Sequence, residues 1–339
     1  MTTFVISPEE DDAAGFHRQL RIQLETIGWQ LASSYEGADV RIHTLHPRLF
    51  TRETTHLLRK TSFNILLRFE PKVVNPLIYS RRIPFMFEAV IDMGKVNQMD
   101  DSQLIIRWPY VAWKNPAIPN DISRREIGDV NSVPVLEKRD IDCIMIASKK
   151  LPYANESNYG LRASIAKERD KLGVSVFGMK WHDSRKILFR DAIRIFIFFL
   201  SQLHLSNPLP LLRGLLAAKR LDISSIEDKF ELLLRSKFAI VVENSDDYVS
   251  EKIIDALLAG AIPIYKGPSL DQFGIPDDCY LRMPDDYRMI PALIGSLSSQ
   301  EQVALYEAGR EFCNSEELSK NWSPRAVANE IAKHLQEIC

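Results

Sequence analysis

Residues 237–276 constrain the fold of this chain more than any other stretch. A short apolar run rich in β-branched residues, at 238–242, has the composition of a strand buried on both faces of a parallel sheet. After a polar turn, apolar residues recur at helical spacing through 253–258, and Gly260 follows where a helix C-cap is expected. A second apolar run at 261–265 predicts the next strand. The order strand, loop, helix, strand predicts a parallel α/β layer.

The polar residues around the start of this helix include a lysine in an unusual place. Lys252 falls in the first turn, where the positive partial charge of the helix disfavours a cation by roughly 0.3–1 kcal/mol. Helix N-termini that follow parallel strands bind phosphate groups, and ligands of open α/β sheets lie at the carboxyl ends of strands. Lys252 therefore indicates an anion site. The charges alone leave an alternative open, a solvated polar face shared by Tyr248, Glu251, Lys252 and Asp255.

The same stretch resembles the signature of the α1,3/α1,4-fucosyltransferases, a family that transfers fucose from GDP-fucose to a sugar hydroxyl. The matching segments are ENS at 243–245, DYVSEKIIDAL at 247–257 and AGAIPIYKGP at 259–268. Ser250 stands where the family has threonine, and the loop before Tyr248 is shorter than in several members. The resemblance implies an α/β protein of GT-B architecture, with two facing Rossmann-like domains and a closing C-terminal helix.

The resemblance also implies the residues of a donor pocket. Asn244, Tyr248, Glu251 and Lys252 would line it, with Glu251 accepting hydrogen bonds from ribose hydroxyls and with Lys252 and Tyr248 reaching phosphate. The role of Glu243 stays open between binding fucose and capping the loop.

A second cation is predicted to join Lys252. Arg162 falls early in a helix expected over 159–172, again a poor place for a positive charge unless an anion lies near. It also matches the S-N-x-x-x-R segment of the resembled family, where the arginine is implied to bind the diphosphate. A surface arginine is the alternative, but the two residues together favour a two-cation clamp on a diphosphate.

Glu70 is the predicted catalytic base. Residues 69–71 read Phe-Glu-Pro at the end of an expected strand and resemble the F-E-S-P of the family, without its serine. The resemblance implies that this glutamate deprotonates the acceptor, and partial desolvation would raise its pKa toward a useful value. The alternative is a surface pair with Arg68 or Lys72, and Glu88 is a second, weaker candidate base.

The transfer is predicted to need neither a metal ion nor a cofactor besides the donor. Asp140 and Asp142 form a D-x-D pattern, which holds a divalent metal in some glycosyltransferases, but this one begins a strand and does not end one. The GT-B alternative neutralises the leaving diphosphate with cations and helix N-termini.

The rest of the chain predicts two α/β domains. Expected strands at 3–6, 38–45, 63–69, 85–91 and 103–108 belong to an acceptor-binding domain over 1–140, and a GDP-sugar-binding domain covers 141–315. The segment 316–339 is expected to form a helix that packs back across the domains, with Ser323 as its N-cap and Pro324 at its first position.

Charge and composition exclude several other classes. The formal net charge of -2 gives no reason to expect nucleic-acid binding, and four widely spaced cysteines predict a reduced cytoplasmic protein. No signal peptide is recognised, and the apolar segment 187–203 contains too many charges to span a bilayer. Animal members of the resembled family have an N-terminal transmembrane anchor, so the resemblance implies a soluble bacterial-type form here. Basic and aromatic residues of that segment leave peripheral membrane contact open as an alternative to a buried helix.

We therefore predict an inverting, metal-independent fucosyltransferase that acts on a glycan or glycolipid hydroxyl, commonly the 3-OH of N-acetylglucosamine or glucose in the resembled family. Lipopolysaccharide or capsule sugars are the expected acceptors. Two alternatives stay open: a GT-B transferase that uses another GDP-sugar, and a non-catalytic protein that binds a GDP-sugar. The oligomeric state does not follow from the sequence.

Overall fold

The computed structural model of the chain describes two compact units. The described residues are 1–7, 16–44, 62–68, 86–93, 103–106, 134–150, 157–178, 181, 223 and 229–339. Unit 1 comprises Met1–Ile127 together with Glu316–Cys339, and unit 2 comprises Gly128–Ser315. The last helical segment thus belongs to the same unit as the N-terminal residues.

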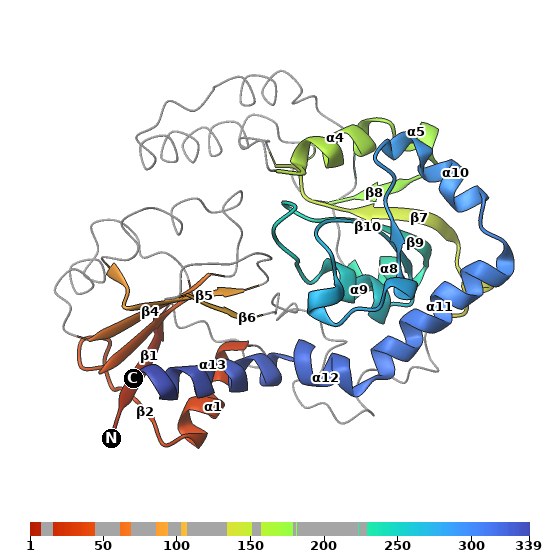
Figure 1. The fold of residues 1–339 in the computed structure, drawn as a ribbon. Coiled ribbons are helices and arrows are strands. Elements are labelled where there is room, and N and C mark those ends of the chain that lie inside the picture. Colours follow the sequence, from red (N-terminus) through yellow and green to blue (C-terminus); the bar gives the residue numbers. More distant parts are fainter. Residues whose placement is uncertain are drawn as a thin grey trace, which may run out of the picture. The chain divides into compact units, whose positions relative to one another are not determined.

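Unit 1 is built on a parallel sheet with the strand order β2-β1-β3-β4-β5-β6 (Figure 1). Its strands are β1 (Thr3–Ser7), β2 (Gln30–Leu31), β3 (Val40–His43), β4 (Phe63–Arg68), β5 (Ala89–Met93) and β6 (Gln103–Ile106). The helices among its described residues are α1 (Phe16–Thr26), α12 (Glu316–Trp322) and α13 (Pro324–Ile338). The expected strands are confirmed, with β5 beginning four residues later than predicted, whereas the two-residue β2 is too short to leave a pattern.

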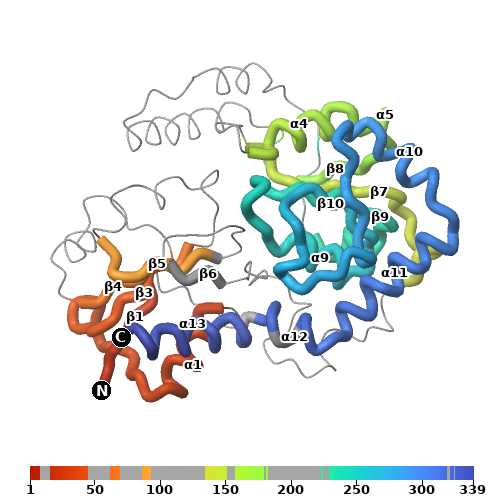
Figure 2. The backbone as a smooth tube through the Cα atoms, in the orientation of Figure 1, coloured from red at the N-terminus to blue at the C-terminus, as the bar shows by residue number. Residues whose placement is uncertain are grey.

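Helix α13 packs against α1 inside unit 1, and Figure 2 shows both ends of the chain in this unit. The predicted N-cap is confirmed, since the Ser323 hydroxyl accepts a hydrogen bond from the Ala326 N–H at 3.0 Å. Val327, Ile331 and Leu335 are buried at helical spacing and form the inward face of α13.

Unit 2 is built on a second parallel sheet, with the strand order β11-β10-β9-β7-β8 (Figure 1). Its strands are β7 (Ile141–Ile146), β8 (Ser175–Phe177), β9 (Ser236–Val242), β10 (Ile262–Lys266) and β11 (Leu281–Arg282). The α-helices among its described residues are α4 (Tyr159–Lys167), α5 (Arg169–Leu172), α8 (Lys229–Leu234), α9 (Lys252–Leu258), α10 (Ile290–Gly295) and α11 (Ser299–Asn314). Four short 3₁₀ helices complete the described part: η3 (Leu136–Lys138), η4 (Asp271–Phe273), η5 (Asp277–Cys279) and η6 (Tyr287–Met289).

The predicted sequence of strand, helix and strand is confirmed as β9, α9 and β10. The last five residues of β9 are each exposed by 4% or less, because the strand is central and covered on both faces. Gly260 has φ of 68°, which glycine adopts without the steric cost that a side chain would bring, and it ends α9. The carboxyl ends of β9 and β10 therefore lie at the same edge of the sheet.

One expectation for the helices of unit 2 is wrong. The helix predicted over 159–172 is divided at Glu168, whose φ and ψ of -102° and 13° separate α4 from α5. The alternative left open for α9, a solvated polar face of four residues, does not form. Tyr248 lies in the loop before the helix and Asp255 is 1% exposed, so neither belongs to a face open to water.

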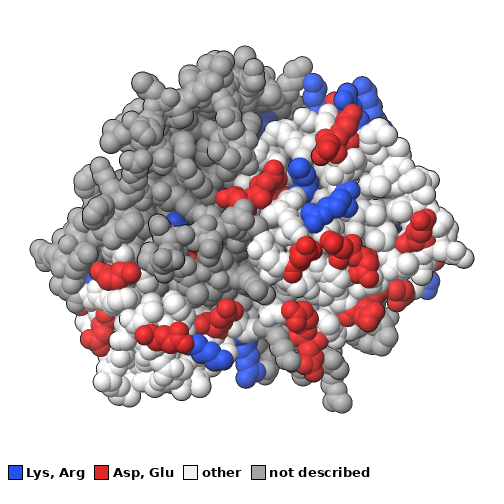
Figure 3. Space-filling model, viewed as in Figure 1, with Lys and Arg blue, Asp and Glu red and all other residues white. Residues whose placement is uncertain are grey.

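The described surface carries both signs of charge. On the face shown in Figure 3, acidic and basic side chains are intermingled, in line with the net charge of -2. Among the described residues, no helix combines the length and apolar character needed to cross a bilayer. The basic aromatic segment 187–203, considered above for membrane contact, lies outside the described residues.

Candidate functional site

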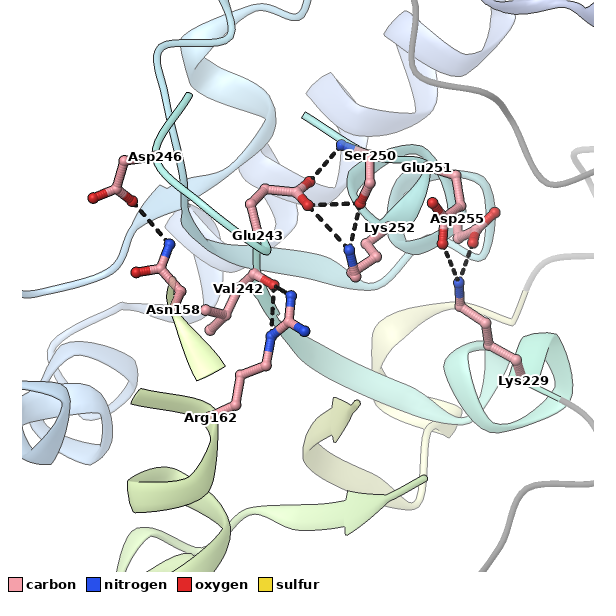
Figure 4. Close-up of polar contacts among 10 residues, drawn as sticks. All are labelled: Asn158, Arg162, Lys229, Val242, Glu243, Asp246, Ser250, Glu251, Lys252 and Asp255. Atoms are coloured by element: carbon pink, nitrogen blue, oxygen red, sulfur yellow. Dashed lines mark hydrogen bonds and ion pairs between the residues drawn. The ribbon is translucent and has the colours of Figure 1, made fainter. Parts of the chain in front are cut away.

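The predicted donor-binding residues gather at the carboxyl edge of the sheet in unit 2. The segment before α4 and the loop after β9 are joined there by a β-bridge between Ser157 and Ser245. Asn158 strengthens this junction, since its N–H donates to the Asn244 carbonyl and its side-chain amide donates to Asp246 Oδ1, both at 2.9 Å (Figure 4). Two segments that lie more than 80 positions apart in the sequence thus form one polar surface.

Arg162 is anchored beneath this surface. The side chain is 5% exposed, and its Nε and Nη2 both donate to the carbonyl of Val242, the last residue of β9 (Figure 4). The Nε bond is 3.1 Å long. Burial lowers the pKa of Arg162, with Tyr159 and the carboxylates of Glu243 and Glu251 opposing this shift, and a guanidinium remains protonated at neutral pH.

Glu243 is fully buried and holds the start of α9. Its Oε1 accepts the Ser250 N–H at 2.9 Å, and its Oε2 accepts the Ser250 hydroxyl at 2.6 Å and the Lys252 ammonium at 3.0 Å. Lys252 also donates to the Ser250 hydroxyl (Figure 4). Of the two roles left open for Glu243, this geometry favours the loop cap, because the carboxylate is occupied by the residues of its own loop.

A further charged group lies beside Glu251. Lys229, from α8, forms ion pairs with Asp255 and, at 3.7 Å, with Glu251. Burial raises the pKa of Glu251, but the ammonium groups of Lys252 and Lys229 more than reverse this effect and lower it below the ordinary value. Glu251 is therefore an ionised hydrogen-bond acceptor at neutral pH.

Arg162 and Lys252 each have donors that their bonds to the described residues do not use. A lysine has three N–H donors and an arginine five. The bonds to described residues use two donors of Lys252 and two of Arg162. The two cations bind consecutive residues, Val242 and Glu243, so both lie at the carboxyl end of β9, where parallel α/β sheets bind ligands.

The other predicted site residues have different outcomes. Asn244 is partly buried and Tyr248 is 4% exposed in the same loop, so the structure brings both to the site. Glu70 lies outside the described residues.

Glu88 lies before β5, and its Oε2 accepts the Asn64 N–H at 2.7 Å near the start of β4. That is the amino-terminal edge of the sheet in unit 1, opposite to the edge at which ligands usually bind.

The D-x-D pattern lies away from this site. Asp140 pairs with Arg235, and Asp142 pairs with Lys237 at 2.7 Å. All four residues lie near the beginnings of β7 and β9, at the amino-terminal edge of the sheet. Among the residues that the structure describes, no group of His, Cys, Asp and Glu has the arrangement of a metal site.

Removal of the Glu243 carboxylate should destabilise unit 2. Glu243→Ala leaves the Ser250 N–H and the Lys252 ammonium without their acceptor, which is expected to cost about 3 kcal/mol of unfolding free energy. Urea denaturation measures the change, with Glu307→Ala on the exposed side of α11 as the matched control. A loss below about 1 kcal/mol would contradict the capping role.

Comparisons with known proteins agree with the resemblance noted in the sequence. None of the protein-family models matches the chain. A fucosyltransferase-like protein from Arabidopsis thaliana is 39% identical over 59 residues, a match that covers 16% of this chain and 12% of the relative. The similarity in sequence is therefore local.

The fold is similar over nearly the whole chain. A crystal structure of an α1,3-fucosyltransferase matches with a TM-score of 0.52 and 12% identity, covering 99% of this chain and 89% of the other. The same kind of enzyme with GDP matches with a TM-score of 0.51 and 13% identity, covering 90% and 81%. An α-glucosyltransferase in complex with UDP and DNA matches with a TM-score of 0.55 and 11% identity, covering 100% and 99%. The predicted GT-B fold is thereby confirmed, and fucosyltransferases are among the proteins that share this fold.

Proposed function

We propose that this chain, which has the fold of GT-B glycosyltransferases, transfers L-fucose from GDP-fucose to a hydroxyl group of a glycan. The observation that carries the proposal is the convergence of two cations, Arg162 and Lys252, on the end of β9. A departing nucleoside diphosphate accumulates negative charge, and fixed cations in a partly buried site stabilise that charge as the sugar leaves.

The donor-binding roles follow the arrangement of the loop. Arg162 and Lys252 bind the diphosphate, and the ionised Glu251 accepts hydrogen bonds from the ribose hydroxyls. Asn244 and Tyr248 line the same pocket. Glu243 does not contact the sugar in this proposal. Its carboxylate instead holds Ser250 and Lys252 in place through hydrogen bonds.

Glu70 serves as the catalytic base, and the Phe-Glu-Pro motif at residues 69–71 is the reason for this assignment. It takes the proton of the acceptor hydroxyl as the acceptor oxygen forms a bond to the anomeric carbon of fucose. The bond from that carbon to the phosphate oxygen breaks, and GDP leaves with the electron pair. One displacement inverts the anomeric configuration, and the two cations take the place of a metal ion.

A donor and acceptor panel tests the proposal. Radiolabelled GDP-fucose, GDP-mannose and UDP-glucose are supplied separately to a glycan array that presents N-acetylglucosamine and glucose 3-hydroxyls. Transfer from GDP-fucose, undiminished by EDTA, is the expected result. Preferred transfer from GDP-mannose would support the alternative donor. Preferred transfer from UDP-glucose would overturn the assignment of GDP. Binding of GDP without transfer from any donor would identify a protein that binds the nucleotide but is not an enzyme.

A further inference from the structure

Lys229 links two carboxylates that differ in exposure, Asp255 in α9 and Glu251 at its N-cap. Its ammonium bonds to Asp255, whose side chain is 2% exposed, and lies 3.7 Å from Glu251, whose side chain is 27% exposed (Figure 4). The lysine is the first residue of α8, which precedes β9 in the sequence, whereas the donor loop follows β9. None of the motifs that predicted the donor site includes it.

The buried end of this group fixes the position of the lysine. A carboxylate as deeply buried as Asp255 is stable only with a charged or hydrogen-bonded partner, and the Lys229 ammonium supplies one. The same ammonium then lies beside the more exposed Glu251. One ammonium group thus pairs with a buried carboxylate and with a carboxylate that water still reaches.

We propose that Lys229 and Asp255 are positioning residues, which hold the Glu251 carboxylate in the orientation that accepts the ribose hydroxyls of the donor nucleotide. This inference rests on the proposed function and adds a part of the same site to it. An unrestrained glutamate would have to lose rotamer freedom on binding. It would also be free to pair with the neighbouring Lys252 and so to compete with the diphosphate for that cation.

Nucleotides with and without ribose hydroxyls test this role. GDP and 2′,3′-dideoxy-GDP are titrated by calorimetry into the full chain and into Lys229→Met, Lys229→Arg and Glu251→Gln variants. Lys229→Met is expected to weaken GDP about tenfold and to leave the dideoxy nucleotide unchanged. Lys229→Arg should restore most of the affinity for GDP, because it keeps the cation, and Glu251→Gln should reproduce the selective loss.

Asp255→Asn provides a second variant should Lys229→Met fail to fold. This replacement removes the ion pair between Asp255 and Lys229. It is expected to weaken the binding of GDP and to leave the binding of the dideoxy nucleotide unchanged. An equal loss of affinity for both nucleotides would overturn the positioning role alone. So would a folded Lys229→Met or Asp255→Asn variant that keeps its affinity for GDP while Glu251→Gln loses it. A wild-type chain that binds neither nucleotide would overturn the proposed function itself.

Discussion

Replacement of both Arg162 and Lys252 by alanine is expected to weaken GDP binding by roughly a thousandfold, and each single replacement by about 30-fold to 100-fold. The reason is that each cation offers charge-assisted hydrogen bonds to the diphosphate, worth about 2–3 kcal/mol apiece in a partly buried site. Isothermal titration with GDP measures the affinity of each variant.

Two matched variants separate this effect from a general loss of positive charge. Arg235→Ala and Lys237→Ala remove the same residue types from the amino-terminal edge of the same sheet, where they pair with Asp140 and Asp142. Both should bind GDP as the wild type does. Thermal melts identify any unfolding in Arg162→Ala, whose guanidinium also binds the Val242 carbonyl. Unchanged GDP affinity in both clamp variants would contradict the two-cation clamp.

Glu70→Gln is expected to lower kcat by about 10²-fold to 10⁴-fold, because the amide cannot take the proton of the acceptor hydroxyl. GDP affinity should stay unchanged, since the base is assigned to the acceptor and the cations of unit 2 to the nucleotide. Steady-state transfer from GDP-fucose gives kcat, and calorimetry gives the affinity for GDP.

Glu88→Gln is the control for this replacement. Glu88 was the second candidate base, but it lies at the amino-terminal edge of its sheet and binds a backbone N–H of β4. Its replacement should leave kcat within about threefold of the wild type. A large loss of kcat in Glu88→Gln, with normal turnover in Glu70→Gln, would reverse the assignment of the base.

Much of the fold was predictable because its signals are local. Apolar runs bounded by turns predicted β9 and β10, and Gly260 predicted the end of α9. Lys252 and Arg162 were recognised because a cation early in a helix conflicts with the local helix charge. The positions of both in the first turns of α9 and α4 are confirmed.

The contacts within the site were not predictable because they join distant segments. Lys229 precedes Asp255 by 26 positions, and Asn158 precedes Asp246 by 88. No periodic pattern encodes such pairs, which depend on how the strands are ordered in the sheet. The burial of Asp255 was missed for the same reason, since spacing on α9 alone placed it on a polar face that in the structure packs against α8.

The most direct test of the donor site is a calorimetric titration of the wild-type chain with GDP, UDP and ADP under identical conditions. If the two cations hold a guanosine nucleotide, GDP should bind saturably and at least ten times more tightly than UDP or ADP. Tighter binding of UDP, or the absence of binding by all three, would contradict this donor site.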